Sequence, residues 1–342
     1  RVVDSGWYVL GPELERFEQA FRDYIGAEHC VGVANGTDAL ELAFRAVGVL
    51  PGQRVATASN AGMYASTALL AIGAEPFFID VSEKSHCITN AEVRRALSSG
   101  VKAVAVTHLY GLACPDTHEI QNLCREAGIP LIEDCAQAHG ARIGENIAGT
   151  FGDVSCFSFY PTKNLGALGD GGALVTNNDG LAECLRELRQ YGWQTKYHAR
   201  RAGGRNSRLD EIQSAVLLSL LPYLDESNDR RRKIAQKYDS EILHPAVSVP
   251  GHESDGYVAH LYVIRTNRRD SLREHLAAQG IASDIHYPIP DHKQAVFKQE
   301  YDDVNLATTE KLAREVVTLP LYPEMSDAQV MSVINAVNEW QV

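Results

Sequence analysis

Short apolar segments alternate with helical segments over residues 29–136, and this order constrains the fold more than any other feature of the sequence. The apolar runs are HCVGVA, QRVATAS, PFFIDV, KAVAVTHL and IPLIEDCA, and the segments between them, such as GTDALELAFRAVG and HEIQNLCREAG, have apolar residues at helical spacing. Alternation of strands and helices is typical of a mainly parallel sheet with helices on both faces. The sequence therefore predicts an α/β fold.

Further elements are expected on either side of this region. A surface helix is predicted near the start of the chain, because Pro12 and Gly26 enclose a segment whose apolar residues recur at helical spacing. Two strands are expected within residues 154–176. A long helical segment over 209–241 is expected to be interrupted at Pro222, since proline breaks a helix.

The C-terminal part of the chain repeats the strand and helix pattern on a smaller scale. After a βαβ-like stretch and a proline-rich loop, helices are predicted near 306–316 and 326–340. A length of 342 residues gives an expectation of two domains. We place the boundary near residue 240, which gives a large domain over 1–240 and a small α/β domain over 241–342.

The net charge restricts the expected binding partners, and the cysteine content restricts the expected compartment and metal content. The chain has 32 basic and 44 acidic residues and a net charge of −12. Such a surface repels nucleic acid and anionic lipid, so neither is expected as a partner. The seven cysteines are odd in number and contain no CxxC spacing, which indicates a reduced, cytoplasmic protein without a metal site. No apolar run reaches the length of a membrane span.

The first candidate site segment is Asn35-Gly36-Thr37-Asp38-Ala39-Leu40, where a predicted strand ends and a helix begins. Small residues leave the backbone N–H groups of a helix N-terminus open, so Gly36 and Thr37 are candidates to hold a phosphate. An ordinary helix cap accounts for this motif equally well. The segment lacks the G-x-G-x-x-G pattern, which disfavours a nicotinamide dehydrogenase.

The second candidate segment is LIEDCAQAHG, in which Asp134 ends a predicted strand. Ligands of open α/β sheets bind beyond the carboxyl ends of the strands, so Asp134 is a candidate site acid. A single acid at this place is otherwise a capping or structural residue. His139 is interpreted as a structural histidine.

The third candidate segment is FSFYPTKNLGALGDGG, in which Lys163 lies between an aromatic strand and a glycine-rich loop. Partial burial would disfavour the ammonium form and leave a nucleophilic amine suited to a Schiff base. The alternative is a surface lysine in a turn.

The fourth candidate segment is 193–208, which contains several basic residues and no acid: Lys196, Arg200, Arg201, Arg205 and Arg208. In a chain of net charge −12 this segment is either a local anion site or a solvated basic loop. Together the four segments supply a phosphate cradle, an acid, a reactive lysine and an anion site, which pyridoxal 5'-phosphate (PLP) requires.

At these motifs the chain resembles the DegT/DnrJ/EryC1/StrS family of PLP-dependent sugar aminotransferases. GWYVLGPELERFEQAF, VGVANGTDALELA, HLYG, EDCAQAHGA, SFYPTKNLGALGDGGALVTN, NSRLDEIQSAVL, HYPIP and LPLYPEMS occur in the family's order. The resemblance implies the fold of fold-type I PLP enzymes, with a mostly parallel seven-stranded sheet and a smaller C-terminal α/β domain.

Site roles follow from this resemblance. Lys163 would bond covalently to the cofactor and move the proton, and Asp134 would pair with the ring nitrogen. Gln137 would lie near the phenolic oxygen of the cofactor. Lysine at position 163 favours transamination, because dehydratase relatives carry histidine there.

The phosphate is expected to contact Gly36, Thr37 and Ser158, with Asn206 supplied by a neighbouring subunit. That shared contact implies a homodimer. Many family members stack an aromatic residue on the pyridine ring, and ungapped alignment puts Gly62 at its position. Tyr64 or Met63 would replace that aromatic, unless Tyr64 is a core residue on a helix face.

The expected reaction transfers an amino group from L-glutamate to a keto-sugar attached to a nucleoside diphosphate, with pyridoxamine phosphate formed midway. GWYVLG and NAGMY favour a dTDP-linked 3-keto-6-deoxyhexose. His286, Tyr287 and Arg205 are candidate substrate contacts. Alternatives are a cyclitol aminotransferase and a PLP-binding regulatory protein without turnover.

Overall fold

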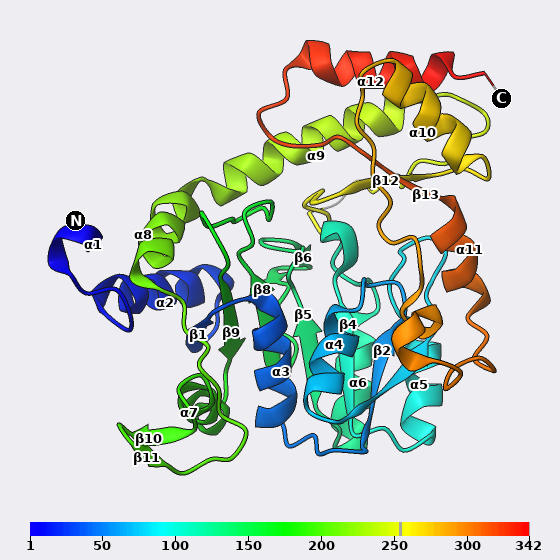
Figure 1. Ribbon diagram of the computed structural model, residues 1–342. Helices are drawn as coiled ribbons and strands as arrows, with labels where there is room; N and C mark the ends of the chain where they lie inside the picture. Colours follow the sequence, from blue (N-terminus) through cyan, green and yellow to red (C-terminus); the bar gives the residue numbers. More distant parts are fainter. Residues whose placement is uncertain (253–254, 342) are drawn as a thin grey trace.

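A seven-stranded sheet forms the centre of the computed structural model, which describes residues 1–252 and 255–341 (Figure 1). The strand order is β1-β9-β8-β5-β4-β2-β3. The strands are β1 (His29–Val33), β2 (Arg54–Ala58), β3 (Glu75–Ile79), β4 (Ala103–Thr107), β5 (Leu131–Asp134), β8 (Val154–Ser158) and β9 (Gly172–Thr176). Pairing is parallel from β8 to β3, and β9 pairs antiparallel with β1 and β8. The mostly parallel seven-stranded sheet is therefore confirmed.

Helices pack on both faces of the sheet. They are α2 (Pro12–Ile25), α3 (Gly36–Ala46), α4 (Tyr64–Ala71), α5 (Asn90–Ser98), α6 (Thr117–Ala127), α7 (Asp179–Leu188) and α8 (Glu211–Leu220). Consecutive strand residues point to opposite faces. Phe157 of β8 packs on Phe21 of α2 with ring centroids 5.0 Å apart, whereas Cys156 belongs to the core shared with α3, α4 and α7. Both faces are apolar because both are covered.

The helix boundaries follow the residues that predicted them. Helix α2 has Pro12 at its first position and ends at Gly26, whose φ of 82° is left-handed. The expected interruption at Pro222 is a 3-10 turn, Leu221–Tyr223, between α8 and α9 (Leu224–Glu241). Short elements complete the large unit: α1 (Val2–Ser5), a 3-10 turn at Leu109–Gly111, the hairpin β6 (Arg142–Ile143) and β7 (Asn146–Ile147), and the hairpin β10 (Trp193–Thr195) and β11 (His198–Ala199).

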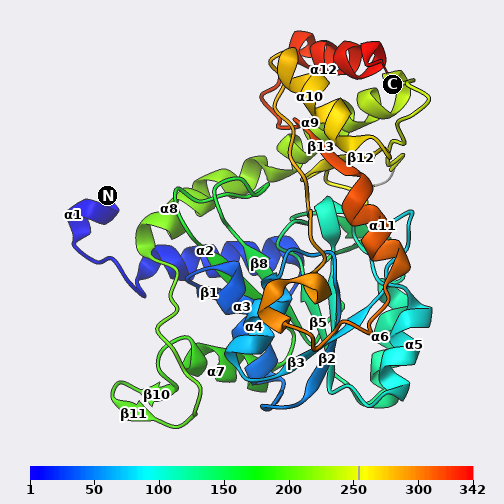
Figure 2. The ribbon, with the colours of Figure 1, turned by 45° about the vertical axis from the view of Figure 1, so that its right-hand side comes forward.

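Helix α9 runs from the sheet to the C-terminal elements (Figures 1 and 2). These elements are β12 (Tyr262–Arg265), α10 (Arg269–Ala278), 3-10 turns at Asp291–Lys293 and Ala295–Phe297, α11 (Ala307–Glu315), β13 (Val316–Leu319) and α12 (Asp327–Glu339). Ile234 and Tyr238 of α9 share a core with β12, β13 and α12. The domain boundary near 240 remains a prediction.

Two features of the C-terminal part differ from the prediction. The helix expected near 306–316 ends at Glu315, and a strand that the sequence analysis missed, β13, begins at Val316. This strand pairs antiparallel with β12, whereas a βαβ unit has parallel strands. The transition is abrupt because no glycine or proline separates α11 from the β-branched residues of β13.

Within 1–252 and 255–341 we find no helix that combines the length and the apolar composition needed to cross a membrane.

Candidate active site

A cavity of about 920 Å³ lies at the carboxyl ends of the central strands. The fold makes this the expected ligand position, because the backbone turns away from the sheet there and leaves space between strands and helices. Nine residues predicted for the site line this cavity: Gly36, Thr37, Tyr64, Asp134, Gln137, Ser158, Lys163, His286 and Tyr287. They come from segments spread over 250 residues of sequence.

The first wall of the cavity joins the start of α3 to the end of β8. Asn35 caps α3, and its side-chain oxygen accepts a hydrogen bond from the Asp38 N–H at 2.8 Å. A Cβ added to Gly36 would lie 2.7 Å from Ser158 Cβ, so only glycine permits this approach. The N-terminal dipole of the 11-residue helix α3 therefore faces the cavity beside a hydroxyl group.

Asp134 is the last residue of β5 and is buried. Its carboxylate accepts a hydrogen bond from the Ala136 N–H at 3.1 Å. Burial raises the pKa of Asp134, although this hydrogen bond and the charge of Lys163 oppose the rise. The carboxylate of Asp134 therefore has capacity to accept a further hydrogen bond, which suits a cationic group in the cavity.

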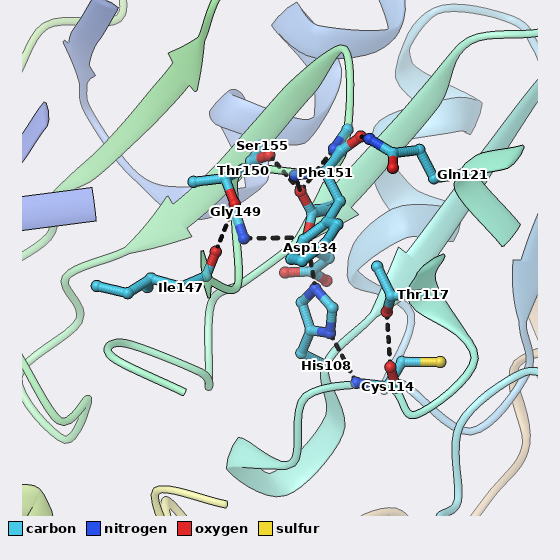
Figure 3. A network of polar contacts seen from close by, with 12 residues as sticks. His108, Cys114, Thr117, Gln121, Asp134, Ile147, Gly149, Thr150, Phe151 and Ser155 are labelled. Carbon is cyan, nitrogen blue, oxygen red and sulfur yellow. Dashed lines mark hydrogen bonds and ion pairs between the residues drawn. The ribbon is translucent and has the colours of Figure 1, made fainter. Parts of the chain in front are cut away.

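The preceding acid, Glu133, has a different environment, and Figure 3 labels its partners His108, Gly149, Phe151 and Ser155. Its carboxylate accepts hydrogen bonds from His108 Nε2 at 2.9 Å, Ser155 Oγ at 3.0 Å and the backbone N–H groups of Gly149, Phe151 and Gly152. His108 Nδ1 in turn accepts from the Cys114 N–H at 2.9 Å, so the ring is neutral and its Nε2–H donates. Although burial opposes ionisation, these bonds hold the pKa of Glu133 below its usual value. Glu133 therefore fixes the 149–152 loop beside the site.

Lys163 projects from a tight turn after β8. The Lys163 N–H donates to the Tyr160 carbonyl at 2.8 Å, and a Cβ at Gly166 would lie 2.5 Å from the Pro161 carbonyl oxygen. Burial lowers the pKa of Lys163 to about 8, and the charge of Asp134 partly offsets this fall. About a tenth of the amine is therefore neutral at pH 7, far more than for a lysine with the usual pKa.

Gln137 and Tyr287 form the opposite wall. Gln137 Oε1 accepts from the Tyr110 N–H at 2.6 Å, and its Nε2 donates to Tyr287 Oη at 3.2 Å. A Cβ at Gly62 would lie 2.7 Å from Cε1 of Tyr287, so the ring of Tyr287 fills the space next to Gly62. No local sequence signal predicts this contact, because 225 positions separate the two residues.

The two candidates for the missing aromatic lie differently. Tyr64 is 47% exposed, lines the cavity at the start of α4 and has its ring centroid 6.2 Å from that of Tyr287. It is not a core residue. Met63 packs instead against Phe78 and Phe297, away from the cavity lining.

Arg205 and Asn206 lie outside the cavity lining. Arg205 pairs with Glu41 and, at 3.3 Å, with Asp38, and its expected substrate contact remains a prediction. Asn206 is exposed and bridges to Gln190, which leaves its role toward a second subunit a prediction.

The basic segment 193–208 is more neutral than its sequence indicates. Arg200 and Arg201 pair with Glu187 of α7, and Arg200 also reaches Glu183 at 3.2 Å. Lys196 and Arg208 lie over the rings of Tyr197 and Tyr191. Arg200, Arg201 and Arg205 therefore have acid partners within the chain, and the choice between an anion site and a solvated basic loop remains a prediction.

Two cavity residues, His260 and Arg231, were missed by the sequence analysis. His260 Nδ1 hydrogen-bonds to Asn164 Oδ1 at 3.0 Å, next to Lys163, and burial holds the pKa of His260 well below its usual value. Single basic residues in the ordinary helical and loop segments after residue 224 gave no signal. His139, interpreted as structural, is buried against the rings of Phe157 and Phe159.

The sheet topology and the shared cavity of Asp134 and Lys163 are those expected of an aminotransferase, and comparison with known proteins gives the family. Residues 1–338 match the model of the DegT/DnrJ/EryC1/StrS aminotransferase family. The chain is 43% identical over 341 residues to the dTDP-3-amino-3,6-dideoxy-alpha-D-galactopyranose transaminase of Aneurinibacillus thermoaerophilus, which covers 99% of this chain and 93% of that protein. The chain belongs to this family, which confirms the resemblance seen in the sequence.

Solved structures of relatives have the same fold. DesV of S. venezuelae, crystallised with a ketimine intermediate, has a TM-score of 0.95 and 42% identity over 99% of this chain and 92% of that one. NtdA of Bacillus subtilis, with bound cofactor PMP, has a TM-score of 0.92 and 28% identity over 98% of this chain and 78% of that one.

Proposed function

We propose that this protein is a PLP-dependent aminotransferase that transfers an amino group from L-glutamate to a keto-sugar carried by a nucleoside diphosphate. The observation that carries the proposal is the placement of Lys163 and Asp134 on one cavity, each influencing the pKa of the other. The family membership supports the reaction class.

The residues around the cavity fit PLP. The glycine-dependent cradle of Gly36 and Ser158 suits a phosphate at the start of α3, with Thr37 beside it. The Asp134 carboxylate suits a protonated ring nitrogen, and the Lys163 amine suits an aldehyde. When bound, PLP supplies an electron-withdrawing ring that acidifies the carbon bearing the transferred amino group.

Lys163 would accept and return the proton at that carbon. A group that shuttles a proton works best when its pKa lies near the working pH, and burial brings the pKa of Lys163 to about 8. Asp134 would hold the ring nitrogen protonated through a charge-assisted hydrogen bond, whose strength increases in its buried position. Gln137, held by its hydrogen bonds to Tyr110 and Tyr287, would lie near the phenolic oxygen of the cofactor and orient the ring.

The acceptor is proposed to be a dTDP-linked 3-keto-6-deoxyhexose. The name of the A. thermoaerophilus relative supports both the nucleotide and amination at carbon 3. His286 and Tyr287 line the cavity and would contact the sugar. His286 Nδ1 is held by the Thr318 hydroxyl at 2.8 Å, which fixes the ring at the edge of the cavity.

A homodimer is proposed as the working unit. Trp7, Tyr8 and Val9 are 58%, 46% and 41% exposed, and they lie beside α8, where Ile212 is 40% exposed. Apolar side chains concentrated on one face are typical of an interface. The exposed Asn206 would then reach the phosphate of the second subunit's cofactor.

Incubation of the PLP-loaded protein with L-glutamate and dTDP-3-keto-6-deoxyglucose tests the proposal by product analysis. The amino sugar is expected from the unsubstituted protein and not from Lys163→Ala, which keeps the phosphate cradle as a matched control for cofactor binding. Amination of a cyclitol ketone in preference to the nucleotide sugar would indicate a cyclitol aminotransferase. A protein that binds PLP but whose absorbance glutamate does not change would be a regulatory member.

A further inference from the structure

Arg231 is a buried arginine that lines the cavity from α9, and it is only 7% exposed. Its Nη1 donates to the carbonyl oxygens of Leu321 at 3.2 Å and Ala259 at 3.4 Å. Both partners are neutral. Among the residues that the structure describes, no carboxylate lies within 4.0 Å of the guanidinium group.

The other two nitrogens of Arg231 have no hydrogen-bond partner in the described part of the chain. Nε is fully enclosed, whereas Nη2 is not among the enclosed atoms. A guanidinium group has five N–H donors in a planar fork, and a buried charge without a counter-ion is strongly unfavourable. The cavity side of Arg231 therefore has donors available for an anion.

Glu324 is the acid whose charge most affects the pKa of Arg231, but it does not neutralise the arginine. Glu324 lines the cavity but is exposed, and it forms no ion pair with Arg231 within the described residues. Burial lowers the pKa of Arg231 to about 10, and the charge of Glu324 offsets only part of that fall. The missing counter-charge is consistent with a bound anion.

Arg231 is also close to the reacting group. The charges of Lys163 and Arg231 both lower the pKa of His260, so His260 has both cations as neighbours. All three side chains line the same cavity. An anion on Arg231 would therefore lie within the space that a substrate bonded near Lys163 occupies.

We propose that Arg231 binds an oxyanion of a substrate, either the carboxylate of the amino donor or the diphosphate of the nucleotide sugar. This assignment rests on the proposed function, since it takes those two molecules as the substrates. The two N–H groups of Nη2 remain available, and a charged donor of this kind suits the oxygen atoms of either anion. The competing explanation is that Arg231 only ties α9 to residues 259 and 321 through its two carbonyl contacts.

Calorimetric titration of the PLP-loaded protein tests the assignment with two probes, glutarate and dTDP. Arg231→Gln removes the charge, and Arg231→Lys keeps a charge without the fork. Arg232→Gln is the matched control, because Arg232 is the next residue of α9, pairs with Asp229 and does not line the cavity. All variants are compared by melting temperature.

Arg231→Gln is expected to weaken one probe about tenfold or more and leave the other within about twofold. Weaker glutarate binding identifies the donor carboxylate, and weaker dTDP binding identifies the diphosphate. Arg231→Lys should give an intermediate loss of affinity for the same probe, and it replaces Arg231→Gln in the titration if that variant does not fold. Unchanged binding of both probes, or equal loss of both with a lower melting temperature, would overturn the assignment. Failure of the unsubstituted protein to transfer an amino group would instead refute the proposed function alone.

Discussion

Substitution of Gly62 by alanine tests the contact between Gly62 and Tyr287. The new Cβ would lie 2.7 to 3.0 Å from three ring carbons of Tyr287, whereas ordinary contacts begin near 3.4 Å. The ring would have to move by several tenths of an ångström, at an overpacking cost of about 1–3 kcal/mol. The φ of +76° adds about 1 kcal/mol for any residue with a Cβ. The expected loss in the free energy of unfolding is about 2–4 kcal/mol.

Gly280→Ala provides the matched control. Gly280 has a φ of +74° and no atom within 4 Å of an added Cβ, so it reports the backbone cost without the clash. Urea unfolding of Gly62→Ala, Gly280→Ala and each variant combined with Tyr287→Ala separates the two contributions. The excess cost at Gly62 should disappear when the ring is absent. Equal costs at the two glycines, or an excess that persists without the ring, would refute the reasoning. Activity should also fall, by up to about 100-fold, because the displaced ring lines the cavity.

Three further predictions concern the site. Because the pKa of Lys163 is lowered to about 8, the amine of the PLP-free protein becomes neutral above that pH. The rate of PLP binding, followed by absorbance, should therefore rise with pH and have its midpoint near pH 8. Asp134→Asn should shift this midpoint to lower pH, and a midpoint near pH 10 would contradict the assignment. Gly36→Ala should weaken PLP binding about tenfold in equilibrium dialysis, since its Cβ would meet Ser158, and unchanged affinity would exclude the cradle. Glu133→Gln should reduce the free energy of unfolding by about 2–4 kcal/mol at pH 7, because an amide cannot accept all five hydrogen bonds; a cost below about 1 kcal/mol in urea unfolding would disprove the anchoring role.

The sheet was predictable because its signal is local. Each strand of the large sheet is a short apolar run, and each connecting helix has its own start and stop residues. The alternation of strands and helices along the chain then predicts that the strands connected by helices run parallel. Strand β13 was not predictable in this way, because Val316–Leu319 follows α11 without a separating residue and pairs with β12, about 50 positions earlier.

The candidate site was predictable where residues follow directly from strand ends. Asp134 ends β5 and Gly36 starts the helix after β1, so their positions in the topology predict both; Ser158, which ends β8, was expected only from the family resemblance. Contacts between distant segments were not predictable. Arg231 lies between two other arginines on the same helix, and only its burial and its lack of an acid partner among the described residues distinguish it from them.

The order of the two acids at the end of β5 also bears on how the strand aligns during folding. Adjacent strand residues point to opposite faces, so a slip of one position would move either Asp134 to the place of Glu133 or Glu133 to the place of Asp134. Aspartate is one methylene shorter and would reach fewer of the five donors, three of which belong to the 149–152 loop, while glutamate would crowd the ligand side. A slip of β5 in either direction would thus be unfavourable, so the two neighbouring carboxylates favour the correct register of the strand.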